Sequence, residues 1–441
     1  MVPEDPDKTV EKASEKGKSE KEQATSSSGF KPQEQAQDLL GRAQKLIQIL
    51  DEGDQELAKA EISIAHASMN LPQEALRLAK LVRPGNARWR ALTIAGKALG
   101  RNNSMKDAVD ISKQMEEEED RACLLDGIAR ALAEQERIKE AVEVVNSIKN
   151  AYRRQQSLSA VAEILALAGR IKDAVETAKE LKDPDRAGRV LSSATVTLSR
   201  ANRMNEATTL LTKIEEKGWR PEGLGEVCAA LARRRELPRA LELLNEVDSE
   251  DHTTVVLAPL IGALVEEGKA SLAQALIENI ENRHARAILI AKVVRELMEA
   301  HDIEQALKVT ERMDYDMPPD ALIEVARGFA RLGDVDRAIR IANGIEVKGS
   351  RIAAFAEIAR VLSSKGKFEE AIAVTRAIKR KKSRDVEQLR IVQEMAKNGK
   401  IEEAVNISGD IETPLYRIYG MARVAVALAG HTFEEHISPT I

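Results

Sequence analysis

Hydrophobic positions along the chain recur in a pattern with a period of 33 residues. Each period is anchored by an alanine, which we call the anchor alanine and count as position 0. The anchor alanines are Ala75, Ala108, Ala141, Ala174, Ala207, Ala240, Ala273, Ala306, Ala338, Ala371 and Ala404. Every step between them is 33 residues except the step from Ala306 to Ala338, which is 32. Such a period predicts a stacked array of similar structural units.

Two amphipathic helices are predicted in each unit. Large apolar residues stand at −16 and −9, as in Leu92 and Leu99, and a small residue usually stands at −12, as in Gly96. The offsets −16, −13, −12, −9 and −8 share one face of an α-helix, which we call the A helix. Another apolar residue stands at +7, as in Val82 and Ile148. We expect it on a second helix, the B helix, which begins near the anchor alanine.

The residues just before the anchor alanine specify the turn between the two helices. Position −5 holds a glycine in five units: Gly169, Gly268, Gly333, Gly366 and Gly399. Glycine adopts the left-handed conformation that ends a helix at little steric cost. Position −1 is acidic in seven units, at Glu74, Asp107, Glu140, Asp173, Glu206, Glu370 and Glu403. These carboxylates complement the helix dipole in the first turn of the B helix.

Counting these units predicts eleven A–B pairs between about residues 55 and 412. A lone B-type helix at 36–50 precedes them, and a lone A-type helix at 415–430 follows. We expect these two helices to cap the ends of an open, elongated array. Pro318 and Pro319 lie where the period shortens to 32, so we expect a local change of pitch there.

Both ends of the chain differ from the array. Residues 1–35 are rich in charge and poor in large apolar side chains, which predicts a disordered N-terminal tail. Residues 431–441 form a short C-terminal tail. The N-terminus has no apolar segment typical of a secretory signal, and no run of eighteen apolar residues occurs. We therefore expect a cytoplasmic protein without a membrane span.

Composition narrows the possible functions. The chain of 441 residues is only 2% aromatic, and its formal net charge of −5 argues against a general polyanion binder. The two cysteines, Cys123 and Cys228, are far apart and indicate reduced thiols. Cys228 occupies the small position −12 and is interpreted as packing, and Cys123 as a plain thiol. His431 and His436 have the wrong spacing for one helical face, so no metal or other cofactor is expected.

The units resemble the tetratricopeptide repeat, a helix–turn–helix of about 34 residues. Its tryptophan site is filled here by Leu92 or Leu125, its leucine–glycine pair by Ile128 and Ala129, and its alanine matches throughout. The sequence departs from that family in its aliphatic residues at aromatic sites and its missing final proline. The resemblance covers roughly residues 40–430. It implies an all-α, right-handed solenoid whose A helices line a concave face that binds peptides or other proteins.

The resemblance also points to candidate binding residues. In that family, positions −18, −15, −11 and −7 face the groove. Cations at −11 and −7 are Arg295, Arg327, Arg331, Arg360 and Lys397 toward the C-terminus, and Lys97, Arg101 and Arg130 toward the N-terminus. If the family's geometry holds, these residues make a basic groove that suits an acidic peptide or a free carboxylate. The alternative interpretation is a solvated charged face.

Two further basic patterns allow more than one interpretation. Position −20 is arginine at Arg88, Arg121, Arg154, Arg220, Arg286, Arg351 and Arg384, with Arg417 equivalent in the last helix. These side chains either bond the last carbonyls of the preceding B helix or form a ladder of anion sites. The run KRKKSR, Lys379 to Arg384, is a nuclear address, a phosphate contact or an ordinary basic loop.

The function that these patterns predict is a protein-interaction scaffold without catalysis of its own. None of the motifs HExxH, GxxxxGK[ST] or GxGxxG occurs in the sequence. The alternative is an RNA-binding solenoid like the pentatricopeptide arrays. The net negative charge and the scarcity of aromatic residues for stacking bases weigh against it. An enzyme would need an appended catalytic domain.

Overall fold

The computed structural model describes residues 32–103, 105–214, 218–245, 250–311 and 319–433. The described residues form 24 α-helices and one short 3₁₀ helix, and they contain no β-strand. The all-α class expected from the sequence is therefore confirmed. The tail expected at 1–35 lies mostly outside the described residues, but residues 32–35 already belong to the first helix.

A helices and B helices alternate along the chain. The A helices are α3 (Glu52–Ser68), α5 (Asn86–Asn102), α7 (Glu118–Glu134), α9 (Ala151–Leu167), α11 (Pro184–Arg200), α13 (Arg220–Arg233), α15 (Glu250–Glu266), α17 (Arg283–Glu299), α19 (Pro319–Leu332), α21 (Lys348–Ser364), α23 (Lys381–Lys397) and α25 (Pro414–Leu428). The B helices are α2 (Pro32–Leu46), α4 (Pro72–Lys80), α6 (Met105–Ser112), α8 (Ile138–Asn146), α10 (Ile171–Ala178), α12 (Met204–Leu211), α14 (Leu237–Leu244), α16 (Ala270–Glu278), α18 (Ile303–Glu311), α20 (Val335–Gly344), α22 (Phe368–Thr375) and α24 (Ile401–Asp410). The 3₁₀ helix η1 (Ile47–Ile49) follows α2.

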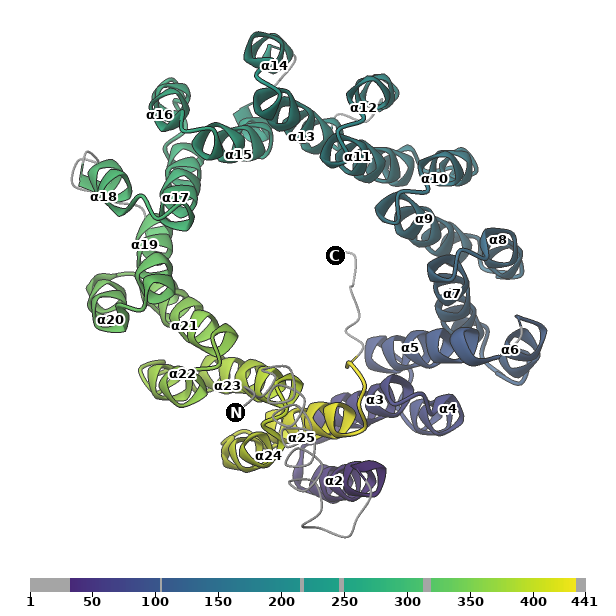
Figure 1. Ribbon diagram of the computed structural model, residues 1–441. Coiled ribbons are helices and arrows are strands. Elements are labelled where there is room, and N and C mark those ends of the chain that lie inside the picture. Colours follow the sequence, from purple (N-terminus) through teal and green to yellow (C-terminus); the bar gives the residue numbers. More distant parts are fainter. Residues whose placement is uncertain (1–31, 104, 215–217, 246–249, 312–318, 434–441) are drawn as a thin grey trace, which may run out of the picture.

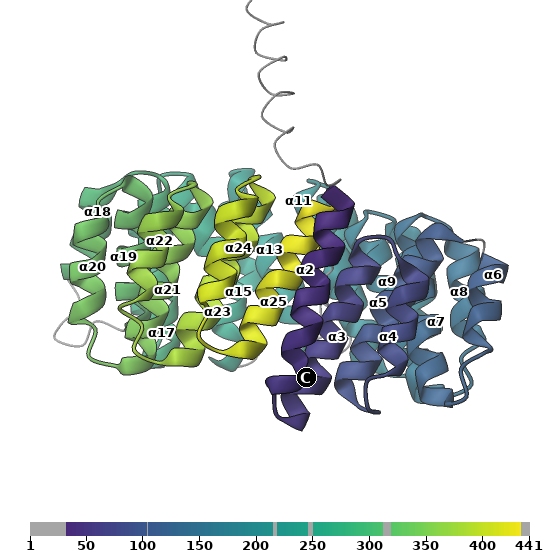
Figure 2. The same cartoon turned by 90° about the horizontal axis from the view of Figure 1, so that it is seen from below.

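The helices are arranged as a closed ring rather than an open array (Figure 1). The A helices form the inner layer, and the B helices form the outer layer. Seen from the side, the ring is a band with the height of one helix (Figure 2). The expectation of an open, elongated trough is therefore wrong, because the last A helix, α25, packs against both α2 and α3.

The two helices expected to cap opposite ends instead form a pair with each other. The outer helix α2 packs on the inner helix α25, and together they complete the ring as a twelfth A–B pair (Figure 2). Ala36, Leu39, Leu40 and Ala43 of α2 are buried. The apolar face that each terminal helix would otherwise show to water is thus covered by the other terminus, so neither end needs a polar cap.

A charged contact at this seam supports the apolar one. Glu61 on α3 is only 1% exposed and lies 3.5 Å from Arg423 on α25 and 3.5 Å from Arg90 on α5. Arg423 also donates a hydrogen bond of 2.5 Å to Gln393 on α23. One carboxylate therefore joins the last, first and second A helices. Removing one partner of a buried ion pair is strongly destabilising.

Ten of the eleven turns from A helix to B helix use one hydrogen-bond pattern, and the turn after α5 differs because Asn103 has φ of −117°. The N–H at −4 donates to the carbonyl at −9, as from Arg170 to Leu165 and from Lys367 to Leu362, both at 2.9 Å. This bond belongs to the Schellman motif, which requires a left-handed residue at −5. The five predicted glycines have φ between 72° and 90°, as expected. Five other units place a non-glycine residue there with φ near 60°, at Asn70, Glu136, Asn202, Arg235 and His301.

Small residues allow the helices to approach each other closely. All eleven anchor alanines are fully buried. At Gly96, position −12 of its unit, a Cβ atom would lie 2.2 Å from the carbonyl oxygen of Leu124 on the neighbouring A helix. The repeated alanines and glycines therefore mark contacts between helices that a larger side chain would push apart.

The sequence pattern predicted that the residues at +7 lie on the B helices. In the structure, those that are described lie just after the B helices end. The B helix α4 ends at Lys80, two residues before Val82, and Ile345 is the residue that caps the end of α20. Among the residues at +7 that the structure describes, all are buried except Ile280, which is half-buried. They hold the connection from one B helix to the next A helix against the core.

The row of arginines at −20 bonds backbone carbonyls in most units. Arg121 donates to the carbonyl of Met115 at 2.6 Å, Arg154 to Ile148 at 3.0 Å and Arg351 to Ile345 at 3.2 Å. Each of these acceptors is the residue at +7 of the preceding unit. The carbonyl-bonding interpretation of these arginines is therefore correct for these units, whereas Arg384 pairs with Glu412 at 2.5 Å instead.

The change of pitch expected at the two prolines falls at the edge of the described residues. Pro318 lies outside them, and Pro319 is the first described residue of α19. Throughout the described residues, no helix combines the length and the hydropathy that a membrane span requires.

Opening the seam is expected to change the shape of the molecule without unfolding its repeats. In a Leu40→Asp, Arg423→Glu double variant, one carboxylate enters a buried apolar contact and a second faces Glu61. We expect a larger radius of gyration in small-angle X-ray scattering and a retained helical circular dichroism signal. The control is Leu81→Asp, at a residue that is 58% exposed. An unchanged radius of gyration in the double variant would contradict closure through this seam.

Glycine is expected to be the better residue at the strained turns. Arg235 has φ of 64° and an exposed side chain, so Arg235→Gly relieves backbone strain without removing a buried contact. Relative to Arg235→Ala, we expect Arg235→Gly to be more stable by about 1 kcal/mol. The reverse experiment is Gly366→Ala, at a residue with φ of 74°. This variant should be less stable than the wild type by a similar free energy of unfolding. Urea unfolding measures both, and equal stability of the two Arg235 variants would rule out the effect of strain.

Candidate binding surface on the inner wall

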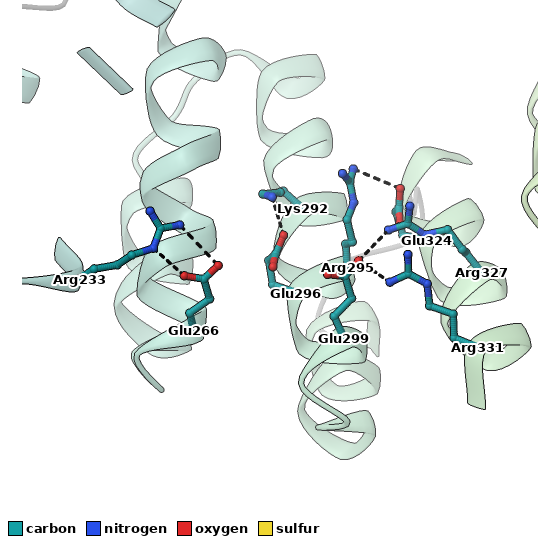
Figure 3. A network of polar contacts seen from close by, with 9 residues as sticks. All are labelled: Arg233, Glu266, Lys292, Arg295, Glu296, Glu299, Glu324, Arg327 and Arg331. Atoms are coloured by element: carbon teal, nitrogen blue, oxygen red, sulfur yellow. Dashed lines mark hydrogen bonds and ion pairs between the residues drawn. The ribbon is translucent and has the colours of Figure 1, made fainter. Parts of the chain in front are cut away.

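All eight cations proposed from the sequence lie on A helices, which form the inner layer of the ring. We call the side chains at −18, −15, −14, −11, −10 and −7 of these helices the inner wall. Figure 3 shows part of it, across α13, α15, α17 and α19, where cations and carboxylates lie next to one another.

Three of the candidates belong to one network between α17 and α19 (Figure 3). Arg327 pairs with Glu324 at 2.7 Å, and Arg331 pairs with Glu299 at 2.5 Å. Arg295 reaches from α17 to Glu324 at 3.2 Å. The network therefore crosses between two adjacent units in both directions.

The other five candidates are paired as well. Lys97 and Arg101 share Glu134 on the next A helix, at 2.7 Å and 3.0 Å. Arg360 reaches Glu387 on the next A helix at 3.1 Å and also contacts Glu357. Two candidates pair within their own helix, Arg130 with Asp126 at 2.9 Å and Lys397 with Glu394 at 2.8 Å.

The inner wall is consequently balanced in charge rather than basic. Each candidate cation has a carboxylate within 3.2 Å. Sequence reasoning weighed positions −11 and −7, where the middle units are mixed and include the acids Glu163 and Glu266. It did not weigh the partner acids at other offsets, Asp126, Glu324, Glu387 and Glu394. The arrangement links successive A helices and presents a mixed pattern of charge to the centre of the ring.

Burial shifts the titration of several wall residues. Desolvation raises the pKa of Glu324, although Arg327 and Arg295 oppose the shift. Desolvation also lowers the pKa of Arg327. For Arg360, burial acts to lower the pKa, but the hydrogen bond to Glu387 and the charges of Glu387 and Glu357 together outweigh it, and the pKa is raised. The wall carboxylates are therefore held partly out of water and rely on their arginine partners.

A second feature lies beside the inner wall, at the start of the A helices, and was not predicted from the sequence. Both tryptophans and one tyrosine lie at the start of A helices, each under an arginine guanidinium. The distance from the arginine Cζ to the ring centroid is 5.1 Å for Arg153 and Trp89. It is 5.2 Å for Arg186 and Tyr152, and 5.7 Å for Arg189 and Trp219. We call Trp89, Tyr152, Trp219, Arg153, Arg186 and Arg189 the aromatic–arginine row.

Carboxylates fix the arginines and one aromatic ring of this row. Arg153 contacts Glu119, and Arg189 pairs with Glu163 at 3.0 Å. The indole N–H of Trp219 donates to Asp185 at 2.6 Å. Tyr152 remains 64% exposed. The sequence signal is weak, because the rare aromatics fall near the start of their A helices, at −19, −22 and −21, but these offsets do not share one helical face.

The residues capable of nucleophilic or metal chemistry are buried or dispersed. Burial raises the pKa of the Cys123 thiol to about 12, so it carries no thiolate at neutral pH. Cys228 is buried with its sulfur 3.4 Å from the carbonyl oxygen of Ala240. His66 is buried with Nδ1 2.8 Å from the carbonyl of Ile62, and burial lowers its pKa. In the described part of the chain, no three His, Cys, Asp or Glu residues are placed to hold a metal ion, and His436 lies outside it.

Comparisons with known proteins add little to this geometry. No protein-family profile matches the chain, and no curated protein sequence matches it. Similar solved structures include Ton1535 from Thermococcus onnurineus NA1, at 21% identity over 77% of this chain and 96% of that one, with a TM-score of 0.25. Naa15/Naa10 bound to HypK-THB matches at 15% identity over 84% and 65%, with a TM-score of 0.25. A circular tandem repeat protein with novel repeat topology and enhanced subunit contact surfaces matches at 15% identity over 90% and 94%, with a TM-score of 0.17. Scores this low carry no argument about fold or function.

The half-buried carboxylate of Glu163 is expected to make stability depend on pH. Desolvation raises its pKa in the folded chain, although Arg189 and Ser159 oppose the shift. The folded state therefore binds this proton more tightly than the unfolded state, so ionisation costs stability as pH rises. As pH falls from 7 toward 4.5, the wild type should gain stability relative to Glu163→Gln in urea unfolding.

An oppositely shifted glutamate provides the control for this experiment. The hydrogen bond from Arg137 lowers the pKa of Glu140, so its contribution should be lost, not gained, as pH falls. The Glu140→Gln variant is thus expected to show a difference of opposite sign and small size. A pH-independent difference between the wild type and Glu163→Gln would contradict the proposed burial effect.

Proposed function

We propose that the chain is a protein-interaction scaffold without catalysis of its own, and that it holds a segment of a partner protein along the inner wall. The observation that carries this proposal is the aromatic–arginine row. Tryptophan, tyrosine and arginine are the residues most enriched at the energetic centres of protein interfaces. Here both tryptophans of the chain gather in one row with an exposed tyrosine.

The geometry of the row suits a binding surface because its side chains are already fixed. The arginines are held between an aromatic ring and a carboxylate, as Arg189 is between Trp219 and Glu163. Side chains that are ordered before binding lose less conformational entropy when a partner arrives. The closed ring adds to this effect, because the inner helices cannot spread apart without breaking the seam.

The charge balance of the inner wall favours a partner of mixed charge over a purely acidic segment. An acidic peptide would have to compete with Glu299, Glu324 and Glu387 for the same guanidinium groups. A segment with both signs of charge can exchange ion pairs with both members of a wall pair. Such polar complementarity contributes more to specificity and association rate than to affinity.

The finer description of the architecture belongs to this proposal. We retain a right-handed tetratricopeptide-like array with a period of 33 residues and eleven consecutive A–B pairs, supported by the spacing of the anchor alanines. We also retain a cytoplasmic location, which is supported by two cysteines that form no disulfide.

The test uses a substitution that leaves the fold intact. A partner captured from the source organism is purified, and its affinity is measured for the wild type and for Tyr152→Ala. Because Tyr152 is 64% exposed, its loss should not unfold the chain. We expect the affinity to fall by at least tenfold, about 1.4 kcal/mol or more, as for an interface anchor.

Two controls separate this outcome from others. Leu81→Ala, at an exposed residue after α4, should leave the affinity unchanged. Charge reversal at Arg327 and Arg360 is a poorer test, because it leaves the half-buried Glu324 and Glu387 without their arginines. Retention of single-stranded RNA with a steep salt dependence, in place of a protein partner, would overturn the proposal.

A further inference from the structure

A pocket of about 620 Å³ lies on the edge of the ring, away from the inner-wall ion pairs. It is bounded by the end of α20, the first two turns of α21 and the connection from α22 to α23 (Figure 1). Asn343, Lys348, Gly349, Arg351, Ile352, Phe355, Ala377, Lys379 and Arg380 line it. This volume is typical of pockets for small molecules.

The charge of the pocket differs from that of the inner wall. Four of the lining side chains are cationic and none is acidic. Arg351 donates one hydrogen bond to the backbone carbonyl of Ile345. No carboxylate lies within ion-pair distance of Lys348, Lys379 or Arg380 in the described ranges of the chain. These three cations without an ion pair contrast with the paired cations of the inner wall.

The other units show that this charge is not required by the repeat. The positions of Lys348, Lys379 and Arg380 correspond to Gly85, Glu116 and Glu117 at the junction of the second and third units. At the junction of the fourth and fifth units they correspond to Ala151, Lys182 and Asp183. The same backbone architecture therefore forms with no cation, or with Lys182 alone, at these positions, so folding does not explain three cations together.

Two helices also begin at this pocket. The residues before α21 and α23, Val347 and Arg380, provide no side-chain cap. The first-turn N–H groups of both helices are thus not engaged by a capping side chain, and the positive ends of two helix dipoles reinforce the cationic side chains. Helix starts of this kind bind phosphate groups.

We propose that this pocket binds a small molecule carrying several phosphate groups. Lys348, Lys379 and Arg380 bind the phosphates, and the side chain of Ile352 gives an apolar surface against which an organic part of the ligand packs. The basic run from Lys379 to Arg384 thereby acquires a role at its first two residues. This inference is independent of the proposed binding along the inner wall.

The test is isothermal titration calorimetry of the full chain at physiological salt with inorganic tripolyphosphate and with ATP. We expect saturable binding of one equivalent. Lys348→Ala and Lys379→Ala should each weaken it by about tenfold or more, because each removes a charge-assisted contact to phosphate. The matched control is Lys382→Ala, which removes the same charge from the same basic run at an exposed residue outside the pocket lining.

The two ligands separate the possible sources of the phosphate groups. If ATP binds more tightly than tripolyphosphate, and Ile352→Ala lowers the affinity for ATP to that for tripolyphosphate, the pocket binds a nucleotide. Equal affinities assign it to the phosphate groups alone, and both outcomes support the proposal. The proposal is overturned if neither ligand binds, or if Lys382→Ala weakens binding as much as Lys379→Ala does. Preferential binding of single-stranded RNA that all three lysine variants weaken equally would also overturn it.

Discussion

The packing of α25 against α2 and α3 is the contact on which the architecture depends. A linear array of helix pairs leaves an apolar face uncovered at each end, and repeat proteins usually cover it with a polar helix. Here the first and last helices of the described array pair with one another, and each covers the face that the other leaves open. Glu61, held between Arg423 and Arg90, adds a charged contact at the same place. Because the ring is closed, every unit packs against a neighbouring unit on both sides.

The inner wall follows from the same arrangement. Twelve A helices facing one centre bring side chains of adjacent units together, and a wall of cations alone would repel itself. The structure balances them, so that Arg331 faces Glu299 and Arg101 faces Glu134. The wall therefore stabilises contacts between units and offers polar groups to a partner. The aromatic–arginine row beside this wall departs from simple pairing, because aromatic surface there stays partly exposed.

The local features of the fold could be predicted from the sequence, and the global ones could not. The anchor alanines, the left-handed glycines and the carbonyl-bonding arginines each depend on a few neighbouring residues. Ring closure depends on the sum of small rotations over all units, which no single unit encodes. Of the inner-wall ion pairs, the sequence predicted the cations but not their carboxylate partners. Arg295, Arg327 and Arg360 were found by offset, but their partners Glu324 and Glu387 were not weighed with them, and the row around Tyr152 depends on stacking between units.

The pairing of the first helix with the last has a consequence for how the chain is made. During synthesis on the ribosome, α2 emerges before the other described helices, and the main packing partner of its Leu39 and Leu40 face, α25, is the last of them to leave the exit tunnel. The nascent chain therefore exposes this apolar surface until α25 has emerged. In a crowded polysome, the α25 of one chain can reach the α2 of its neighbour, and the product of that exchange is a double-length, two-chain ring.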